Sequence, residues 1–546
     1  MQDSLQLFTA RSGLISAKAL LADGTVRHIH SLVDPARESA FYENMCFWGD
    51  VIIFAGIGLG YHIARKTGSI PKQAILVVID YYEKLIEHCR ANVFSGLPNT
   101  VVAVSEPNFE QSISSANSLL ENLPAATVQV VKHPASVSIN REFYALALDR
   151  LHTSRSKQSA GTVGAIEKAL VMFGNFFLEE EVVNAARGLG VEPFLFSYND
   201  FCGFNYEDEL LRLLQKYRPS FVLSINMKGF DGNGAFEDIT ARLGVPVVIW
   251  FVDDPRPILM HRLSFIKNNL IAACWEKSYL PYLQKAGFSK VAFMPLATDP
   301  KLFSTTTASA PHTQLGFVGT AMVDNFAGNI RDKFLWSDCL APLVDLVSDR
   351  IVADPFYPVE TGLRACSQDI GISLPFSDMR NITWLCTYCI HTASMKKRKR
   401  IIGGLLDKGI ETFGDPEGWK SLFGAPLKTH PNIDYRRSLR DTYADICLNV
   451  NITSCQMPQA VNQRVFDIPC CGSFLITDNQ ADLQKLFDTR RETVVYENLS
   501  DLRDKIGYYS AHDTQRNRIA SAARKRILQE HTYALRMRSI MQLLRS

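Results

Sequence analysis

The sequence has no large excess of charge of either sign and no long hydrophobic run. Lys and Arg number 58 against 56 Asp and Glu, for a formal net charge of +2. This balance gives no electrostatic reason to expect nucleic-acid binding. The strongest apolar runs, 51–55 and 245–252, are far shorter than the ~20 residues that span a bilayer. We therefore expect no nucleic-acid partner and no integral membrane segment.

An export signal, ordered cysteine spacings and the common metal motifs are also missing. The chain begins MQDSLQLFTARSG, which lacks the apolar core of a secretory signal. Its twelve cysteines are scattered, as is typical of reduced core thiols in a cytoplasmic protein. Cys386 and Cys389 form a single CxxC, whereas structural zinc needs four ligands. We therefore expect a cytoplasmic protein without a metal site.

What is present is an alternation of β-rich runs and amphipathic stretches, which is typical of α/β layers around parallel sheets. The 546 residues suggest three or four domains at ~150 residues each. Polar segments near 151–162 and 304–313 predict linkers. We predict a Rossmann-like domain over 1–155, a second over 163–305 and a third over 313–546. A basic run, 396–400, is interpreted as a solvated helix face.

The first block contains a glycine-rich turn. Gly56, Gly58 and Gly60 follow a buried strand, and Asp80 ends the next strand. Such glycines let a ligand approach the backbone at a helix N-terminus, and the acidic residue would hold a ribose hydroxyl. The spacing is GxGxG and lacks the further glycine of the dinucleotide fingerprint. The alternative is a tight turn that binds no ligand.

This turn resembles the first motif of class I S-adenosylmethionine methyltransferases. It is also similar to the Rossmann-like module of bacterial motility-associated glycosylation factors. No methyltransferase-type catalytic tetrad such as NPPY follows it.

The second block places two carboxylates at a strand end. The run 245–252 predicts a strand buried on both faces, and Asp253 and Asp254 follow it directly. Ligands of open α/β sheets bind outside the carboxyl ends of the strands. The pair could supply a general base, clamp an acceptor hydroxyl or chelate a cation. Alternatively, the carboxylates cap the next helix.

The third block contains the run VNQRVFDIPCCGSFLITD, which predicts a helix, a glycine turn and a strand. A carboxylate at Asp467 could accept both ribose hydroxyls of a nucleotide, and Arg464 could reach its diphosphate. The alternative is an i,i+3 surface ion pair between these residues, worth a few tenths of a kcal/mol.

These segments, together with WFVDDPRP, FMPLATDP and GFVGTA, resemble the bacterial CgeB-type glycosyltransferase family over about residues 220–540. The resemblance implies a GT-B architecture of two facing Rossmann-like domains, with the donor on the C-terminal one. It implies a donor site made of Gly319, Arg331, Asn462, Arg464, Asp467 and Gly472. The family usually has Glu where Asp467 stands. Such enzymes commonly need no metal or other cofactor, because helix N-termini and basic side chains carry the diphosphate charge.

We therefore predict a bacterial glycosyltransferase that moves a sugar from a nucleotide-diphosphate donor to a protein or surface-glycan acceptor. The acceptor could be a surface or flagellar protein recognised by the first block, with Asp253 or Asp254 as the base or acceptor clamp. One alternative is a methyltransferase module, binding S-adenosylmethionine at the first glycine turn, fused to a glycan-modifying enzyme. The other is a non-catalytic scaffold that binds a sugar or a nucleotide.

Overall fold

The computed structural model describes residues 4–21, 23–42, 47, 49–95, 97, 99–121, 128–152, 166–174, 176–198, 206–305, 311–323 and 330–545. The predicted boundaries at 155 and 163 lie outside these residues. The chain forms two compact units. The first comprises Met1–Leu170, Phe196–Ser220 and Phe230–Val245, and the second comprises Val171–Leu195, Phe221–Gly229 and Pro246–Ser546.

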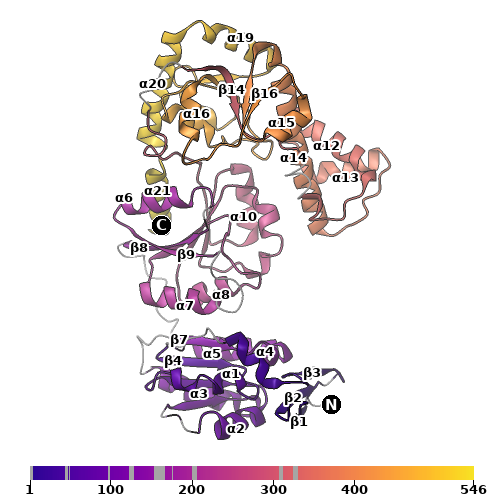
Figure 1. Cartoon of the computed structure of the whole chain (residues 1–546), viewed down its shortest axis with the longest axis vertical. Coiled ribbons are helices and arrows are strands. Elements are labelled where there is room, and N and C mark those ends of the chain that lie inside the picture. Colours follow the sequence, from indigo (N-terminus) through magenta and orange to yellow (C-terminus); the bar gives the residue numbers. More distant parts are fainter. Residues whose placement is uncertain are drawn as a thin grey trace. The chain divides into compact units, whose positions relative to one another are not determined.

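The N-terminal part holds a small antiparallel sheet and a parallel one (Figure 1). The antiparallel sheet is β1 (Ser4–Thr9), β2 (Ile15–Leu20) and β3 (Val26–His28). The parallel sheet has the order β6-β5-β4-β7, with β4 (Val51–Ala55), β5 (Ile75–Ile79), β6 (Val101–Val104) and β7 (Val128–Lys132). Its helices are α1 (Tyr61–Ala64), α2 (Glu83–Asn92), α3 (Phe109–Glu121), α4 (Pro134–Ile139) and α5 (Arg141–His152). Every residue of β4 is buried, as expected for a central parallel strand.

The second sheet has the order β13-β12-β11-β10-β8-β9, and its neighbouring strands β10, β11, β12 and β13 are parallel. Its strands are β8 (Lys168–Phe173), β9 (Glu192–Ser197), β10 (Phe221–Ile225), β11 (Val247–Phe251), β12 (Leu270–Cys274) and β13 (Lys290–Phe293). The helices along this stretch are α6 (Glu179–Gly188), α7 (Tyr206–Tyr217), α8 (Ala235–Arg242), α9 (Pro255–Leu259) and α10 (Leu280–Ala286). Strands β10, β11 and β12 are buried throughout, which explains their continuous apolar sequences.

The third sheet is parallel, with the order β16-β15-β14-β17-β18-β19. Its strands are β14 (Thr313–Val318), β15 (Glu411–Phe413), β16 (Lys428–His430), β17 (Ile446–Asn451), β18 (Leu475–Asp478) and β19 (Val494–Tyr496). Its helices are α12 (Ala341–Ala353), α13 (Val359–Asp369), α14 (Met379–Gly403), α15 (Pro416–Phe423), α16 (Leu439–Asp445), α17 (Arg464–Cys470), α18 (Leu483–Leu486), α19 (Leu499–Ser510), α20 (Asp513–Glu530) and α21 (Tyr533–Arg545). Helices α12 and α13 share a separate hydrophobic core with α14 (Figure 1).

The last helix, α21, packs against α6, which follows the first strand of the second sheet (Figure 1). Arg536 on α21 donates from Nε to the Pro295 carbonyl at 2.8 Å and from Nη2 to the Leu296 carbonyl at 3.0 Å. Thr298 and Thr532 form an isolated parallel bridge beside these contacts. The C-terminal helix therefore ties the second and third sheets together within the second unit.

The prediction of the α/β class is confirmed: three Rossmann-like sheets follow one another along the chain. Along the described parts of the chain, no helix combines the length and apolarity needed to cross a bilayer.

Candidate active site

The glycine turn after β14 is held by contacts from two neighbouring elements. Gly319 has φ +154°, its N–H donates to the Phe413 carbonyl at 2.9 Å, and its own carbonyl accepts from Trp419 Nε1 at 2.9 Å. A Cβ at this position would lie 3.0 Å from the Phe317 ring and 3.3 Å from Arg464 Nη1. The turn therefore requires glycine and brings bare backbone next to a guanidinium.

Two arginines meet above the Phe317 ring beside this turn, with guanidinium carbons 5.7 Å (Arg398) and 5.4 Å (Arg464) from its centroid. Arg398 is 6% exposed and donates from Nη1 to the Thr320 carbonyl at 2.7 Å, while its Nε has no partner within the described structure. Burial and the nearby Arg464 lower the pKa of Arg398 to about 9.

Arg464, at the start of α17, donates from Nε to Asn451 Oδ1 at 2.8 Å and from Nη2 to the Ile452 carbonyl at 3.4 Å. Burial lowers its pKa as well. Both guanidiniums thus donate to neutral oxygens. Because buried cations are expensive without an anionic partner, this arrangement is suited to bind an anion.

Two other residues of the predicted donor motif support this pair. Asn462 donates from Nδ2 to Asn451 Oδ1 at 2.9 Å and so holds the oxygen that accepts from Arg464. The Asn462 Oδ1 atom is buried and has no partner within the described part of the chain. Gly472, with φ +85°, forms the turn between α17 and β18 that the sequence predicts.

Asp467 lies one turn along α17 from Arg464 and is fully buried. Gln463 Nε2 donates to its Oδ1 at 3.2 Å, and its Oδ2 has no hydrogen-bond partner among the described atoms. Burial raises the pKa of Asp467 well above its usual range. Burial also raises the pKa of Glu181 on α6, whose side chain is 3% exposed. The alternative of a surface ion pair is therefore wrong for Asp467.

The two carboxylates after β11 have different partners. Asp253 Oδ2 accepts from Asn226 Nδ2 at 2.7 Å, and Asn226 Oδ1 accepts from the Val252 N–H at 2.8 Å. Burial raises the pKa of Asp253 to about 6. Asn226 and Met227 both have left-handed backbone, with φ +52° and +56°. Strain of this kind is typical of functional sites, and here it holds the amide that orients Asp253.

Asp254 is the N-cap of α9. It accepts from the Arg256 N–H at 3.0 Å and forms an ion pair with Arg256 Nη2 at 2.5 Å. The helix-cap interpretation is therefore correct for Asp254, and Asp253 alone of the two keeps the geometry of a base.

The glycine turn of the N-terminal domain is occupied by the chain itself. Asp80 is fully buried, and its Oδ2 accepts from the N–H groups of Ile57 at 2.9 Å and Gly58 at 3.3 Å. The next N–H, of Leu59, donates to His30 Nε2 at 2.7 Å. Gly58 has φ +51°, and a Cβ there would lie 2.3 Å from the same His30 atom. The amides that would meet a ligand are thus already bonded to side chains.

Gly56 and Gly60 flank this turn with φ +75° each. A Cβ on Gly56 would lie 2.7 Å from Ser136 Cβ, and one on Gly60 would lie 2.8 Å from Val93 Cγ2. The three glycines are therefore required by close packing as well as by the backbone angles.

Arg331 lies in an aromatic cluster beside the separate core of helices α12, α13 and α14, which we call the helical insertion. Its Nε donates to the Tyr388 hydroxyl at 2.6 Å, and its guanidinium lies 4.6 Å from the Trp336 ring centroid. Within the described residues, no hydrogen bond or ion pair joins it to Gly319. Cys386 and Cys389 are buried in the same core, and no group of three or more His, Cys, Asp or Glu within the described ranges could hold a metal.

Sequence reasoning missed Arg398 and Glu181. Arg398 belongs to the basic run 396–400, so the prediction of a solvated face is wrong for it: α14 turns this side chain toward Thr320. Asn226 follows the run 221–225 at a strand end comparable to that of Asp253, as the sequence indicates, and the structure joins the two side chains by a hydrogen bond.

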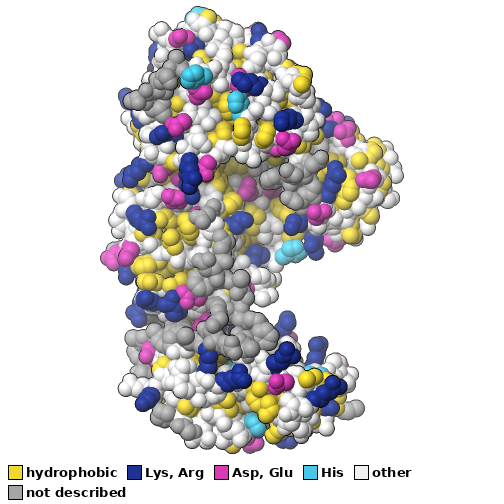
Figure 2. Space-filling model, viewed as in Figure 1, with side chains coloured by type: hydrophobic (Ala, Val, Ile, Leu, Met, Phe, Trp, Pro, Cys, Tyr) yellow, Lys and Arg dark blue, Asp and Glu magenta, His cyan; other side chains and the backbone are white. Residues whose placement is uncertain are grey.

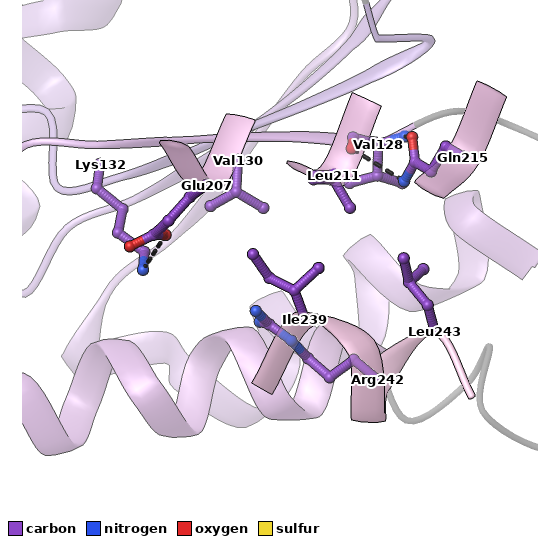
Figure 3. Close-up of a pocket in the computed structure, with 9 residues that line it drawn as sticks. All are labelled: Val128, Val130, Lys132, Glu207, Leu211, Gln215, Ile239, Arg242 and Leu243. Carbon is purple, nitrogen blue, oxygen red and sulfur yellow. Dashed lines mark hydrogen bonds and ion pairs between the residues drawn. The ribbon is translucent and has the colours of Figure 1, made fainter. Parts of the chain in front are cut away.

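A cavity in the first unit offers no alternative site of sufficient size. It has a volume of about 60 Å³, and apolar side chains of β7, α7 and α8 point into it beside the Lys132–Glu207 ion pair (Figure 3). Since small-molecule sites usually measure about 300–1,000 Å³, the cavity is too small for a nucleotide.

The model of the "Glycosyl transferase-like" family matches residues 389–542, which include Arg398, the helix α17 motif and the last helices. The chain therefore carries a glycosyltransferase-like domain. No curated protein matches its sequence.

Among solved structures, the chain is similar to sucrose-phosphate synthase from Thermosynechococcus elongatus, at 10% identity and TM-score 0.41, covering 69% of this chain and 98% of that one. It is similar to Anabaena Alr3699/HepE in complex with UDP-glucose, at 9% identity and TM-score 0.40, covering 69% and 99%. It is also similar to the T4 phage BGT in complex with UDP-glucose, at 9% identity and TM-score 0.38, covering 69% and 98%.

Proposed function

We propose that the protein transfers a sugar from a nucleoside diphosphate donor to a hydroxyl group of a protein or surface-glycan acceptor. The observation that carries this proposal is the pair of guanidiniums of Arg398, which is buried, and Arg464, which is half-buried; both donate to neutral oxygens beside the Gly319 turn. A diphosphate supplies two negative charges and several acceptor oxygens, which matches two guanidiniums and bare backbone. The family match over 389–542 supports the same class of reaction.

The donor would lie on the third sheet, in the proposed domain 313–546. Asn462 would orient Asn451 and Arg464, and the unpartnered Oδ2 of Asp467 would accept a ribose hydroxyl. Gly472 would position α17 through its turn. These roles follow the resemblance to CgeB-type glycosyltransferases, and the geometry around Arg464 is consistent with them.

The acceptor would lie on the second sheet, in the proposed domain 163–305, with Asp253 as the general base. Its carboxylate would take the proton of the acceptor hydroxyl as that oxygen bonds to the anomeric carbon. The bond from that carbon to the donor diphosphate would break, and the two arginines would hold the charge of the departing nucleoside diphosphate. No metal or other cofactor takes part in these steps.

The N-terminal domain, proposed as 1–155, would recognise the acceptor, by resemblance to motility-associated factors. We do not propose the methyltransferase alternative, because Asp80 and His30 already occupy the amides of its glycine turn.

Thermal unfolding with UDP, GDP, dTDP, CMP and S-adenosylmethionine tests the proposal. A ligand at 100 times its Kd adds about 2.7 kcal/mol of stability, which such an assay detects. We expect one nucleoside diphosphate to stabilise the protein and the effect to be lost in Arg464→Ala. Arg518→Ala, in helix α20, is the matched control. No stabilisation by any nucleotide would favour the scaffold alternative, and stabilisation only by S-adenosylmethionine would favour the methyltransferase alternative.

A further inference from the structure

The small antiparallel sheet exposes an unusual share of the apolar side chains. Eighteen large hydrophobic residues of the described chain are exposed, and seven of them lie between residues 7 and 33. These are Leu7, Leu14, Ile15, Leu20, Val26, Leu32 and Val33. Figure 2 shows hydrophobic surface among lysine and arginine side chains where Figure 1 draws β1–β3. Concentrated apolar surface of this kind marks an interaction site.

The two edges of this sheet differ in protection. The edge strand β3 has three residues and carries Arg27 and His28, whereas the edge strand β1 has six residues, SLQLFT, with no charge and no proline. Within the described structure β1 pairs with β2 alone. Proteins commonly protect edge strands by shortness, charge or proline. Since β1 has none of these features, its free edge is suited to pair with another strand.

We propose that β1 pairs antiparallel with β1 of a second copy of this chain, about a twofold axis at Gln6. The sequence around this residue reads Leu-Gln-Leu, so it is symmetric about the axis. Leu5 would face Leu7 of the partner subunit, and Gln6 would face Gln6 of the partner subunit. Isologous pairing of this kind is the usual route to a dimer.

The charges and the packing of β1 are compatible with this pairing. Because Ser4–Thr9 carries no charged side chain, the strand meets no like charge in a second copy. Leu5 and Leu7 lie opposite Ala19 and Ala17 in the β1–β2 register, on the face that packs against Leu59. The partner's leucines would extend this apolar face.

The size of the sheet also fits a dimer. Because the axis lies at Gln6, residues 4–8 of the two strands pair, and these five residues span about 17 Å at 3.4 Å per residue. The result would be a continuous six-stranded sheet across the twofold axis.

Light scattering coupled to size-exclusion chromatography of the full chain tests this proposal. We expect a mass of two chains of 61.2 kDa. Gln6→Lys and Gln6→Glu should each give monomers, because they place like charges directly opposite each other. An equimolar mixture of the two variants should restore the dimer, because opposite charges then meet across the axis. Gln111→Lys, an exposed change on α3, is the charge-matched control and should remain dimeric.

Gln6 is exposed and lies opposite Lys18 of β2, so Gln6→Lys also brings two like charges together within one subunit, whereas Gln6→Glu does not. Circular dichroism and thermal unfolding would verify that both variants fold. A monomeric wild-type protein would overturn the proposal, and so would a dimer that persists unchanged in Gln6→Lys. A monomer that binds anionic vesicles would assign the apolar surface to lipid instead. None of these results depends on nucleotide binding, so the proposal can fail or hold independently of the proposed transferase activity.

Discussion

The molecule contains two glycine turns after the first strand of a parallel sheet, and they differ in what meets their backbone. At Gly56–Gly60 a carboxylate and an imidazole of the chain accept the turn amides. At Gly319 the neighbours are two guanidiniums that donate to neutral oxygens. The first turn has its hydrogen bonds satisfied by side chains of the chain itself, whereas at the second neither guanidinium forms an ion pair within the described residues. A glycine turn thus indicates a ligand site only when its surroundings leave something for a ligand to satisfy.

The largest effect expected from this contrast is on stability at the first turn. Gly58→Ala should destabilise the protein by about 2–5 kcal/mol, because left-handed backbone costs about 1–2 and the overlap with His30 about 1–3 kcal/mol. Chemical denaturation followed by circular dichroism would measure it. Gly68→Ala, in the same domain with nothing within 4 Å of its Cβ, should be nearly neutral.

A second measurement separates the two components of that cost. In a His30→Ala background, the penalty of Gly58→Ala should fall to the backbone component of about 1–2 kcal/mol. An unchanged penalty in the double variant would show that His30 does not fill the turn. Binding of the nucleoside diphosphate should be the same in all variants that fold.

The fold was largely predictable because parallel strands buried on both faces read as continuous apolar runs. Strands β4, β10, β11 and β12 show this plainly. The antiparallel strands β1–β3 were not predicted, because β1 and β3 are mostly exposed and so lack a buried periodic pattern. Helices α12 and α13 were anticipated only as a helix-rich middle, since their separate core depends on tertiary packing.

The candidate site was predictable in position but not in chemical detail. Adjacent acids at a strand end cannot be told apart by sequence, and only the structure shows that Asp254 caps α9 while Asp253 accepts from Asn226. Arg398 was missed for a similar reason. A basic run on a helix is usually solvated, and burial of one member depends on which face packs against the sheet.

The second largest effect should be on affinity at the Gly319 turn. Arg398→Ala and Arg464→Ala should each weaken nucleoside diphosphate binding by about 10- to 100-fold, because hydrogen bonds to charged groups contribute about 1.5–3 kcal/mol. Isothermal titration calorimetry would measure the loss. Arg398→Met should also leave the ligand-free protein as stable as before or more stable, because it removes a buried cation that no described anion contacts. Unchanged affinity in both alanine variants would contradict the assignment of the Gly319 turn as a ligand site.

A smaller effect separates binding at the turn from chemistry at Asp253. As a base, Asp253 must be ionised, so kcat should fall about tenfold per pH unit below about 6, the pKa of its carboxyl. Asn226→Ala removes a hydrogen bond that favours the ionised form, so this acidic limb should move to higher pH. The Kd of the nucleotide should not follow the same limb. A pH profile of kcat that is unmoved in Asn226→Ala would remove Asp253 from the role of base.

The smallest effect is expected at Arg331, and it decides how far the donor site extends. Its guanidinium is bonded to the Tyr388 hydroxyl and packs on the Trp336 ring. A side chain held in this way has little freedom to reach a diphosphate, so Arg331→Ala should change nucleotide affinity by less than about twofold, in contrast to Arg464→Ala. The variant should still lose some thermal stability, since a cation–π contact contributes about 0.5–2 kcal/mol. Titration calorimetry and thermal unfolding on one preparation separate the two readouts. A tenfold loss of affinity would return Arg331 to the donor site and would show that the helical insertion rearranges when the nucleotide binds.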